Sequence, residues 1–304
     1  MAIERACTQI VPKPWGSTDL RPWYVHHDDG AAIGEIWFRR TDPTAPDSAL
    51  LLKLLFTNAP LSIQVHPNDT FASSIGLAHG KAEAWYVLSA LCNAKVALGL
   101  KSPLSPAQLR ISIDDGSISE RVQWRSVTAG DVIFVPPGTI HAIGAGLVIV
   151  EIQQRSDATF RLFDYGRQRE LHADHAVAAA SGEPAEPQAS ARKLTAARTL
   201  LVASPHFVLE RCEIPPGSGS ELLAARETWL FVLAGGARVG SIDAGFSEVL
   251  FLEAERTLIR AGPDGLKALV AYSGPDAIPD LLRDLDPENT RLAGASRSEP
   301  FGTE

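Results

Sequence analysis

The sequence predicts a mainly β protein built from two copies of one β-barrel unit. Short strand-like runs follow one another closely, each bounded by Gly, Pro, Asn or Asp. This spacing is typical of a sandwich or barrel and not of a βαβ fold. A weak internal repeat and a single clear helical insertion support the same class.

Strand-like runs dominate the chain. The runs predicted as strands are 31–38, 49–56, the run that starts at Leu61, 82–88, 94–100, 131–135, 147–154, 158–165 and, in the second half, 206–214.

The helical insertion is predicted near residues 104–125. Its start reads L-S-P-A-Q-L-R-I-S-I-D-D-G. Ser105 suits an N-cap, Pro106 suits the first helical position, and Gly116 suits a stop. We therefore expect a helix on a loop of the first barrel.

The repeat joins the two halves of the chain. E-A-W-Y-V-L begins at Glu83, and E-T-W-L-F-V begins at Glu227. A second pairing sets D-V-I-F-V-P-P-G-T-I-H, from Asp131, against E-V-L-F-L-E-A-E-R-T-L, from Glu248. In this ungapped pairing His141 lies opposite Leu258, so the second copy has lost a histidine. We expect four segments: a catalytic N-terminal barrel over 1–175, a helix and linker over 176–200, a metal-free C-terminal barrel over 201–286, and a flexible tail over 287–304.

Composition excludes several classes of protein. The formal net charge of −8 argues against a nucleic-acid surface, although a small anion needs only a local basic pocket. No apolar run reaches the roughly 18 residues of a membrane span, and the start lacks a signal-peptide pattern. The three cysteines, Cys7, Cys92 and Cys212, lie far apart and indicate reduced thiols in a cytoplasmic protein.

Four side chains form a candidate metal site. Gln64 and His66 share one face of a strand because residues two apart point the same way. Glu83 begins another strand, and His141 follows a rigid P-P-G turn. Two imidazoles, a carboxylate and an amide oxygen suit zinc or another divalent first-row metal, with an open position for catalysis.

Four stretches resemble type I phosphomannose isomerase, also called mannose-6-phosphate isomerase, in its short bacterial form. These stretches are S-I-Q-V-H-P-N-D, G-K-A-E-A-W-Y-V-L, P-P-G-T-I-H-A-I-G and E-I-Q-Q-R-S-D-A-T-F-R-L-F-D-Y-G-R. The resemblance covers roughly residues 10–175. It implies two cupin (jelly-roll) barrels, one Zn²⁺ per chain, and interconversion of mannose 6-phosphate and fructose 6-phosphate in carbohydrate metabolism.

The resemblance also implies roles for individual residues. Carried over by position, the metal ligands are Gln64, His66, Glu83 and His141. Lys81 and Arg161 fall on catalytic positions that also bind substrate, Ser62 falls on a substrate-binding position, and Glu151 on a catalytic one. One departure is Ala82, which stands where the family has Thr and removes a hydroxyl expected near the metal.

The residue types suit an aldose–ketose isomerisation through a cis-enediol. The metal, Lys81 and Arg161 can supply positive charge, and Glu151 is a candidate proton carrier. The base stays open between a metal-bound water and a histidine. Arg155, Arg161 and Arg167 are the arginines of the last motif that could bind a phosphate group. Their spacing along the strand does not show which of them faces inward.

Two other functions remain open from sequence alone. One is an isomerase of another sugar or sugar phosphate, and the other is a non-catalytic sugar-binding cupin. The sequence leaves the oligomeric state undetermined. Core packing is expected for Trp37, Trp85 and Phe134, and a surface or helix position for His172.

Overall fold

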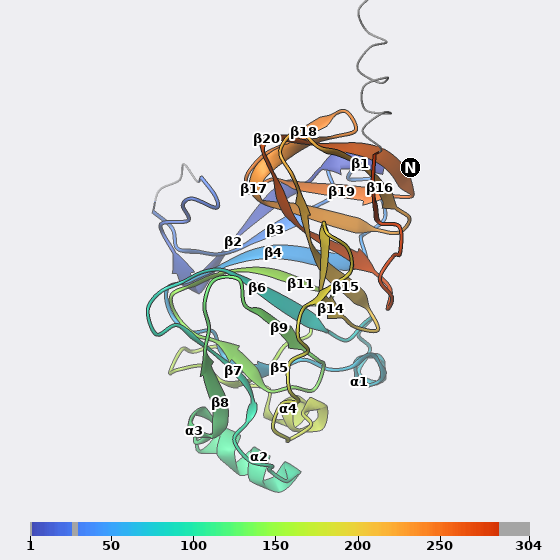
Figure 1. Ribbon diagram of the computed structural model, residues 1–304. Helices are drawn as coiled ribbons and strands as arrows, with labels where there is room; N and C mark the ends of the chain where they lie inside the picture. Colours follow the sequence, from blue (N-terminus) through green and yellow to red (C-terminus); the bar gives the residue numbers. More distant parts are fainter. Residues whose placement is uncertain (1, 26–29, 286–304) are drawn as a thin grey trace, which may run out of the picture. The chain divides into compact units, whose positions relative to one another are not determined.

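A computed structural model describes residues 2–25 and 30–285 (Figure 1). These residues divide into two compact units, one of residues 7–190 and one of residues 2–6 with 191–285. The predicted mainly β class is confirmed, because strands dominate and the described residues contain four short helices. The predicted tail over 287–304 lies outside the described residues.

The unit of residues 7–190 contains a six-stranded antiparallel sheet. Its strands are, in spatial order, β2 (Cys7–Ser17), β3 (Ile33–Arg39), β4 (Leu50–Thr57), β11 (Leu147–Gln154), β6 (Glu83–Ala90) and β9 (Val132–Val135). Five of the runs predicted as strands, at 31–38, 49–56, 82–88, 131–135 and 147–154, correspond to strands of this sheet. Its edge strand β2 was not indicated by the pattern.

A five-stranded sheet completes the unit. Its strands are β12 (Phe160–Phe163), β5 (Ile63–Val65), β10 (His141–Ile143), β7 (Lys95–Leu100) and β8 (Val122–Ser126). One buried cluster joins Trp85 and Ile149 of the first sheet to Val96 and Leu98 of the second. Because alternate residues of a strand share a face, these side chains form the core between the two sheets.

The helices of this unit cover the other face of the five-stranded sheet. They are α1 (Asp69–Ser74), α2 (Pro106–Asp114), α3 (Ile118–Arg121) and α4 (Ala173–Ala179), and α2 to α4 gather at the lower end of the unit in Figure 1. Leu109 and Ile113 pack with Ile63 and Val65 in a second buried cluster.

The helical insertion begins as the sequence predicts. Ser105 caps α2 in a capping box with Gln108. The insertion is shorter than expected, because residues 122–126 pair with β7 as strand β8. The predicted linker over 176–200 is also shorter, since residues 192–193 and 198–203 are strands.

The second unit contains a ten-stranded sheet. Its strands are β1 (Ala2–Arg5), β13 (Arg192–Lys193), β14 (Arg198–Ala203), β15 (Phe207–Ile214), β16 (Gly219–Ala224), β17 (Thr228–Val239), β18 (Ile242–Ala244), β19 (Val249–Glu253), β20 (Glu255–Ser273) and β21 (Leu282–Asp284). The first strand of the chain, expected in the N-terminal barrel, instead pairs with β19.

A buried ion pair lies within this second unit. Arg198 donates to both carboxylate oxygens of Glu210, at 2.8 and 2.7 Å. The hydroxyl of Tyr272 donates to the same carboxylate, at 2.5 Å. Arg198 also donates to the carbonyls of Ile278 and Pro279, so the network holds the segment before β21 against β14 and β15.

None of the helices in the described ranges has the length and apolar character needed to span a bilayer. The three cysteines are free.

Candidate active site

Strand register sets a row of polar side chains on the inner face of the six-stranded sheet. Lys53 of β4 lies opposite Trp37 on one side and opposite Glu151 on the other. Glu151 in turn lies opposite Trp85 of β6. The Nζ of Lys53 is 3.2 Å from Glu151 and 3.8 Å from the carboxylate of Glu35. The inner face therefore changes from apolar to charged along these strands.

A second row crosses the five-stranded sheet. Gln64 of β5 lies opposite Arg161 on one side and opposite His141 on the other. His66, two residues after Gln64, points to the same face. The amide of Gln64 and the imidazole of His66 therefore lie in the same site.

His66, Glu83 and His141 converge in the interior. The Nε2 of His66 is 3.3 Å from one carboxylate oxygen of Glu83, and the Nε2 of His141 is 3.2 Å from the other. All three residues are at most 1% exposed. The Nζ of Lys81 lies 2.6 Å from Glu83 and 3.1 Å from the Nε2 of His66. Gln64 closes the group, with its Nε2 at 3.3 Å from His141.

Backbone carbonyls set the tautomer of both histidines. The Nδ1 of His66 lies 2.8 Å from the carbonyl of Ala158, and that of His141 lies 2.8 Å from the carbonyl of Thr139. Since a carbonyl can only accept, each Nδ1 carries the proton, and each Nε2 presents a lone pair to Glu83. Facing lone pairs of this kind are stabilised by a cation between them.

Burial keeps both imidazoles neutral. It lowers the pKa of His66 to about 4, with the Lys81 ammonium acting in the same direction. Burial also lowers the pKa of His141. For Glu83, burial alone would raise the pKa, but the adjacent Lys81 ammonium more than offsets it and holds the pKa well below the ordinary value. The site therefore offers two neutral imidazoles and an ionised carboxylate.

These donors fit a metal ion. The ligand atoms of His66, Glu83 and His141 lie within 4.8 Å of one another and could hold one. Apart from the ion pair with Lys81 at 2.6 Å, the oxygens of Glu83 have no hydrogen-bond donor in the described part of the chain. The Oε1 of Gln64 accepts from Ser62 at 3.0 Å, so a rotation of the amide would turn an oxygen toward the group.

Two tight turns position His141 and Glu83. Gly138, at φ +85°, allows the turn before His141 and donates its N–H to the carbonyl of His66. Gly80 packs so closely that a Cβ there would lie 2.5 Å from the carbonyl of Pro67. The side chain of Gln154 accepts from the N–H of Ala82 and so pins the start of β6.

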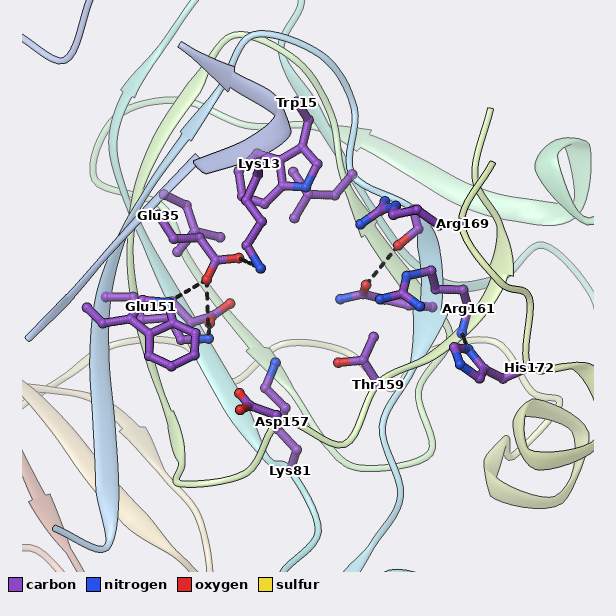
Figure 2. Close-up of a pocket in the computed structure, with 16 residues that line it drawn as sticks. Lys13, Trp15, Glu35, Lys81, Glu151, Asp157, Thr159, Arg161, Arg169 and His172 are labelled. Carbon is purple, nitrogen blue, oxygen red and sulfur yellow. Dashed lines mark hydrogen bonds and ion pairs between the residues drawn. The ribbon is translucent and has the colours of Figure 1, made fainter. Parts of the chain in front are cut away.

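A cavity of about 350 Å³ adjoins this group. Its lining, drawn in Figure 2, consists of Lys13, Trp15, Glu35, Trp37, Lys53, Leu55, Leu61, Ser62, Gln64, Lys81, Glu151, Asp157, Thr159, Arg161, Arg169 and His172. The structure brings together all eight residues that the sequence proposed: five line the cavity, while His66, Glu83 and His141 contact Lys81 or Gln64 on its wall.

Two expectations from the sequence are wrong. Trp37 lines the cavity instead of packing in the core, and its Nε1 donates to Glu35 at 2.5 Å. His172 also lines the cavity, because its backbone N–H donates to the carbonyl of Arg161. Ala82 is fully buried and is absent from the lining formed by the described residues.

Sequence reasoning missed the charged residues Lys13, Glu35, Lys53 and Arg169. One signal was available, because a lysine in the middle of the apolar run A-L-L-L-K-L-L-F needs a buried partner. Lys53 finds two carboxylates there, which explains why a lysine only 5% exposed is tolerated.

Known proteins resemble this chain in sequence. A mannose-6-phosphate isomerase of Streptococcus mutans is 37% identical over 200 residues, which cover 62% of this chain and 62% of that protein. The mannose-6-phosphate isomerase ManA of Bacillus subtilis is 39% identical over 130 residues, or 40% of this chain and 41% of that protein. No protein-family model matches. The resemblance expected from the motifs is confirmed, although the matches span less than two thirds of these relatives.

The fold is also shared with a solved structure. The crystal structure of a mannose 6-phosphate isomerase from Bacillus subtilis matches with a TM-score of 0.76 at 24% identity, covering 90% of this chain and 100% of that chain. This likeness shows the fold that the cupin resemblance predicted.

Proposed function

We propose that this protein is a metal-dependent aldose–ketose isomerase that interconverts mannose 6-phosphate and fructose 6-phosphate through a cis-enediol. The observation that carries the proposal is the buried group of His66, Glu83 and His141 beside a polar cavity of about 350 Å³. A cavity of this size can enclose a hexose phosphate. The names of the sequence relatives support the same substrate pair.

The ion is proposed to be one Zn²⁺ per chain, with other divalent metals as alternatives. Gln64, His66, Glu83 and His141 would hold it, because nitrogen and carboxylate donors suit zinc and an open position suits catalysis. When bound, the ion supplies Lewis-acid charge for the substrate oxygens. We propose the unit of residues 7–190 as catalytic, a metal-free structural role for the other unit, and a cytoplasmic location.

The chain's own residues have distinct proposed roles. Lys81, whose pKa stays above the ordinary value because Glu83 and Glu151 offset the effect of burial, supplies fixed positive charge. Arg161 presents a guanidinium to the cavity whose only hydrogen bond in the described residues, to the carbonyl of Glu170, is long at 3.5 Å. Both can stabilise the charge that develops on the enediol oxygens, Ser62 can bind substrate, and Glu151 can carry a proton.

Metal analysis combined with an isomerisation assay tests the proposal. We expect about one divalent ion per chain and conversion of mannose 6-phosphate to fructose 6-phosphate that a chelator abolishes and added metal restores. Conversion of another sugar phosphate or of free mannose at a higher rate would change the substrate. Binding of metal and sugar without any exchange would instead identify a sugar-binding cupin.

Replacing Arg161 with Ala is expected to lower kcat by about 100-fold while metal content stays near one ion per chain. The loss follows from removing a cation that faces the cavity without being a ligand. The matched control is Arg155→Ala, because Arg155 bonds to Ser48 and lies outside the cavity lining. Equal rates for the two variants would show that Arg161 takes no part in the reaction.

A further inference from the structure

Two walls of different charge face each other across the cavity (Figure 2). On one wall, Lys13 and Lys53 are balanced by Glu35 and Glu151. The other wall carries Arg161 and Arg169. Arg169 is paired with Asp164, but no carboxylate in the described residues forms an ion pair with Arg161. This arginine wall therefore holds one positive charge without a paired carboxylate.

The arginine wall is built by a loop that returns on itself. The backbone N–H of Arg161 donates to the Nδ1 of His172 at 3.1 Å, and the N–H of His172 donates to the carbonyl of Arg161 at 2.9 Å. These two bonds close the loop between the two residues. The closure brings Arg169 back beside Arg161 on the cavity wall.

Asp164 fixes the orientation of Arg169. This carboxylate, 2% exposed at its side chain, accepts from the Nε of Arg169 at 2.7 Å and from its Nη2 at 2.6 Å. The Nη1 group of Arg169 makes no hydrogen bond to any described residue. A guanidinium held along one edge in this way presents the rest of its fork to an oxyanion.

His172 adds a neutral donor to the same wall. Because its Nδ1 accepts a hydrogen bond from the backbone, its proton lies on Nε2. The arginines named from sequence do not compete for this role. Arg155 bonds to Ser48, and Arg167 bonds to the carbonyl of Pro60, so neither lines the cavity.

We propose that Arg169 binds the phosphate group of the substrate, with His172 as a second donor, and that Asp164 is the residue that positions Arg169. This inference rests on the proposed sugar-phosphate substrate and extends it to the end of the sugar remote from the reaction. Lys81, next to the metal group, and Arg169 lie on different sides of the cavity in Figure 2, as an extended hexose phosphate requires.

The test compares Arg169→Met with Arg167→Met in the metal-loaded enzyme. Arg167 is a matched control, because it belongs to the same loop and also contacts Asp164, at 3.3 Å. We expect Arg169→Met to raise KM for mannose 6-phosphate and the inhibition constant of inorganic phosphate together, by about 10- to 100-fold, with kcat little changed. Arg167→Met should alter neither constant.

A third variant, Lys13→Met, examines the opposite wall. If phosphate inhibition weakens in Lys13→Met and not in Arg169→Met, the phosphate binds at the lysine wall and the proposal is overturned. An Arg169→Met variant with a lower kcat but unchanged KM and phosphate inhibition would overturn it too. Calorimetric binding of mannose 6-phosphate and inorganic phosphate gives the same comparison without turnover. Failure of the isomerase proposal can therefore be distinguished from failure of the phosphate-binding proposal.

A double-mutant cycle tests the positioning role of Asp164. If Asp164 acts through Arg169, Asp164→Asn should raise KM in the wild-type background but add nothing in the Arg169→Met background. An additional rise in KM in that background, or a fall in kcat alone, would show a different role for Asp164. Circular dichroism of each variant establishes that it is folded, and the arginine variants decide phosphate binding even if Asp164→Asn does not fold.

Discussion

Replacing Glu83 with Gln is expected to lower turnover of mannose 6-phosphate by about 1000-fold or more and to remove the bound metal. The substitution keeps the shape of the side chain but removes the charge that faces both imidazoles, at 3.3 and 3.2 Å. Changes to residues that only support metal ligands already cost roughly 10- to 100-fold, so the loss of a direct ligand should cost more. Metal content by mass spectrometry and initial rates with excess metal measure the two effects.

The matched control for this prediction is His79→Ala. His79 is exposed, lies four residues before Glu83, and is absent from the cavity lining and the metal-ligand group found in the described residues. It should leave rate and metal content unchanged. Normal turnover by metal-free Glu83→Gln protein would exclude a metal-dependent mechanism, whereas normal metal content with lost turnover would assign Glu83 to the reaction itself.

The candidate site could be predicted from sequence where a strand pattern and residue chemistry coincide. Alternation alone sets Gln64 and His66 on one face, and an amide and an imidazole on an inner face require a partner. The turn before His141 was also recognisable, because Pro136, Pro137 and Gly138 suit a rigid reversal. These local signals identified candidate metal ligands without any knowledge of which strands are neighbours.

The charged walls of the cavity depend on information that the local pattern lacks. The contact of Lys53 with Glu151 follows from the register of β4 against β11, and these strands are almost 100 residues apart in the chain. Arg169 reaches the cavity because the loop folds back on Arg161 through two hydrogen bonds to His172, one to its side chain and one from its backbone. Register and loop closure are set by tertiary packing, so residue types alone did not indicate them.

Residues matched by the internal repeat have different surroundings in the two units. Glu227 matches Glu83 in the repeat, but its carboxylate accepts a hydrogen bond from the Nε1 of Trp229 at 3.1 Å. Leu258, matched to His141, is 41% exposed on β20 and offers no ligand atom. The same sequence pattern thus belongs to a group that could hold a metal ion in one unit and to a side-chain hydrogen bond in the other.

Replacing Glu210 with Ala is expected to destabilise the second unit by about 3–5 kcal/mol, because it leaves a buried guanidinium without its carboxylate. Arg198 is 1% exposed and Glu210 is fully buried, so water cannot take over the lost contacts. The hydroxyl of Tyr272 loses its acceptor as well. Hydrogen exchange of β14, β15 and β20 amides measures the effect in this unit, since unfolding of a two-unit chain is not expected to be two-state.

Glu213→Ala is the matched control, because Glu213 lies on the same strand and its ion pair with Lys267 is more than 40% exposed on both sides. Such an exposed pair contributes about 1 kcal/mol or less. If Glu210→Ala does not fold, Tyr272→Phe tests the same network. It removes a hydrogen bond to the Glu210 carboxylate and the acceptor of the Ile278 N–H, so it should cost at least about 1.5–3 kcal/mol. Equal protection from hydrogen exchange in the Glu210 and Glu213 variants would mean that the buried ion pair adds no more stability than the exposed one. In that case apolar packing around β15 would account for the stability of this unit.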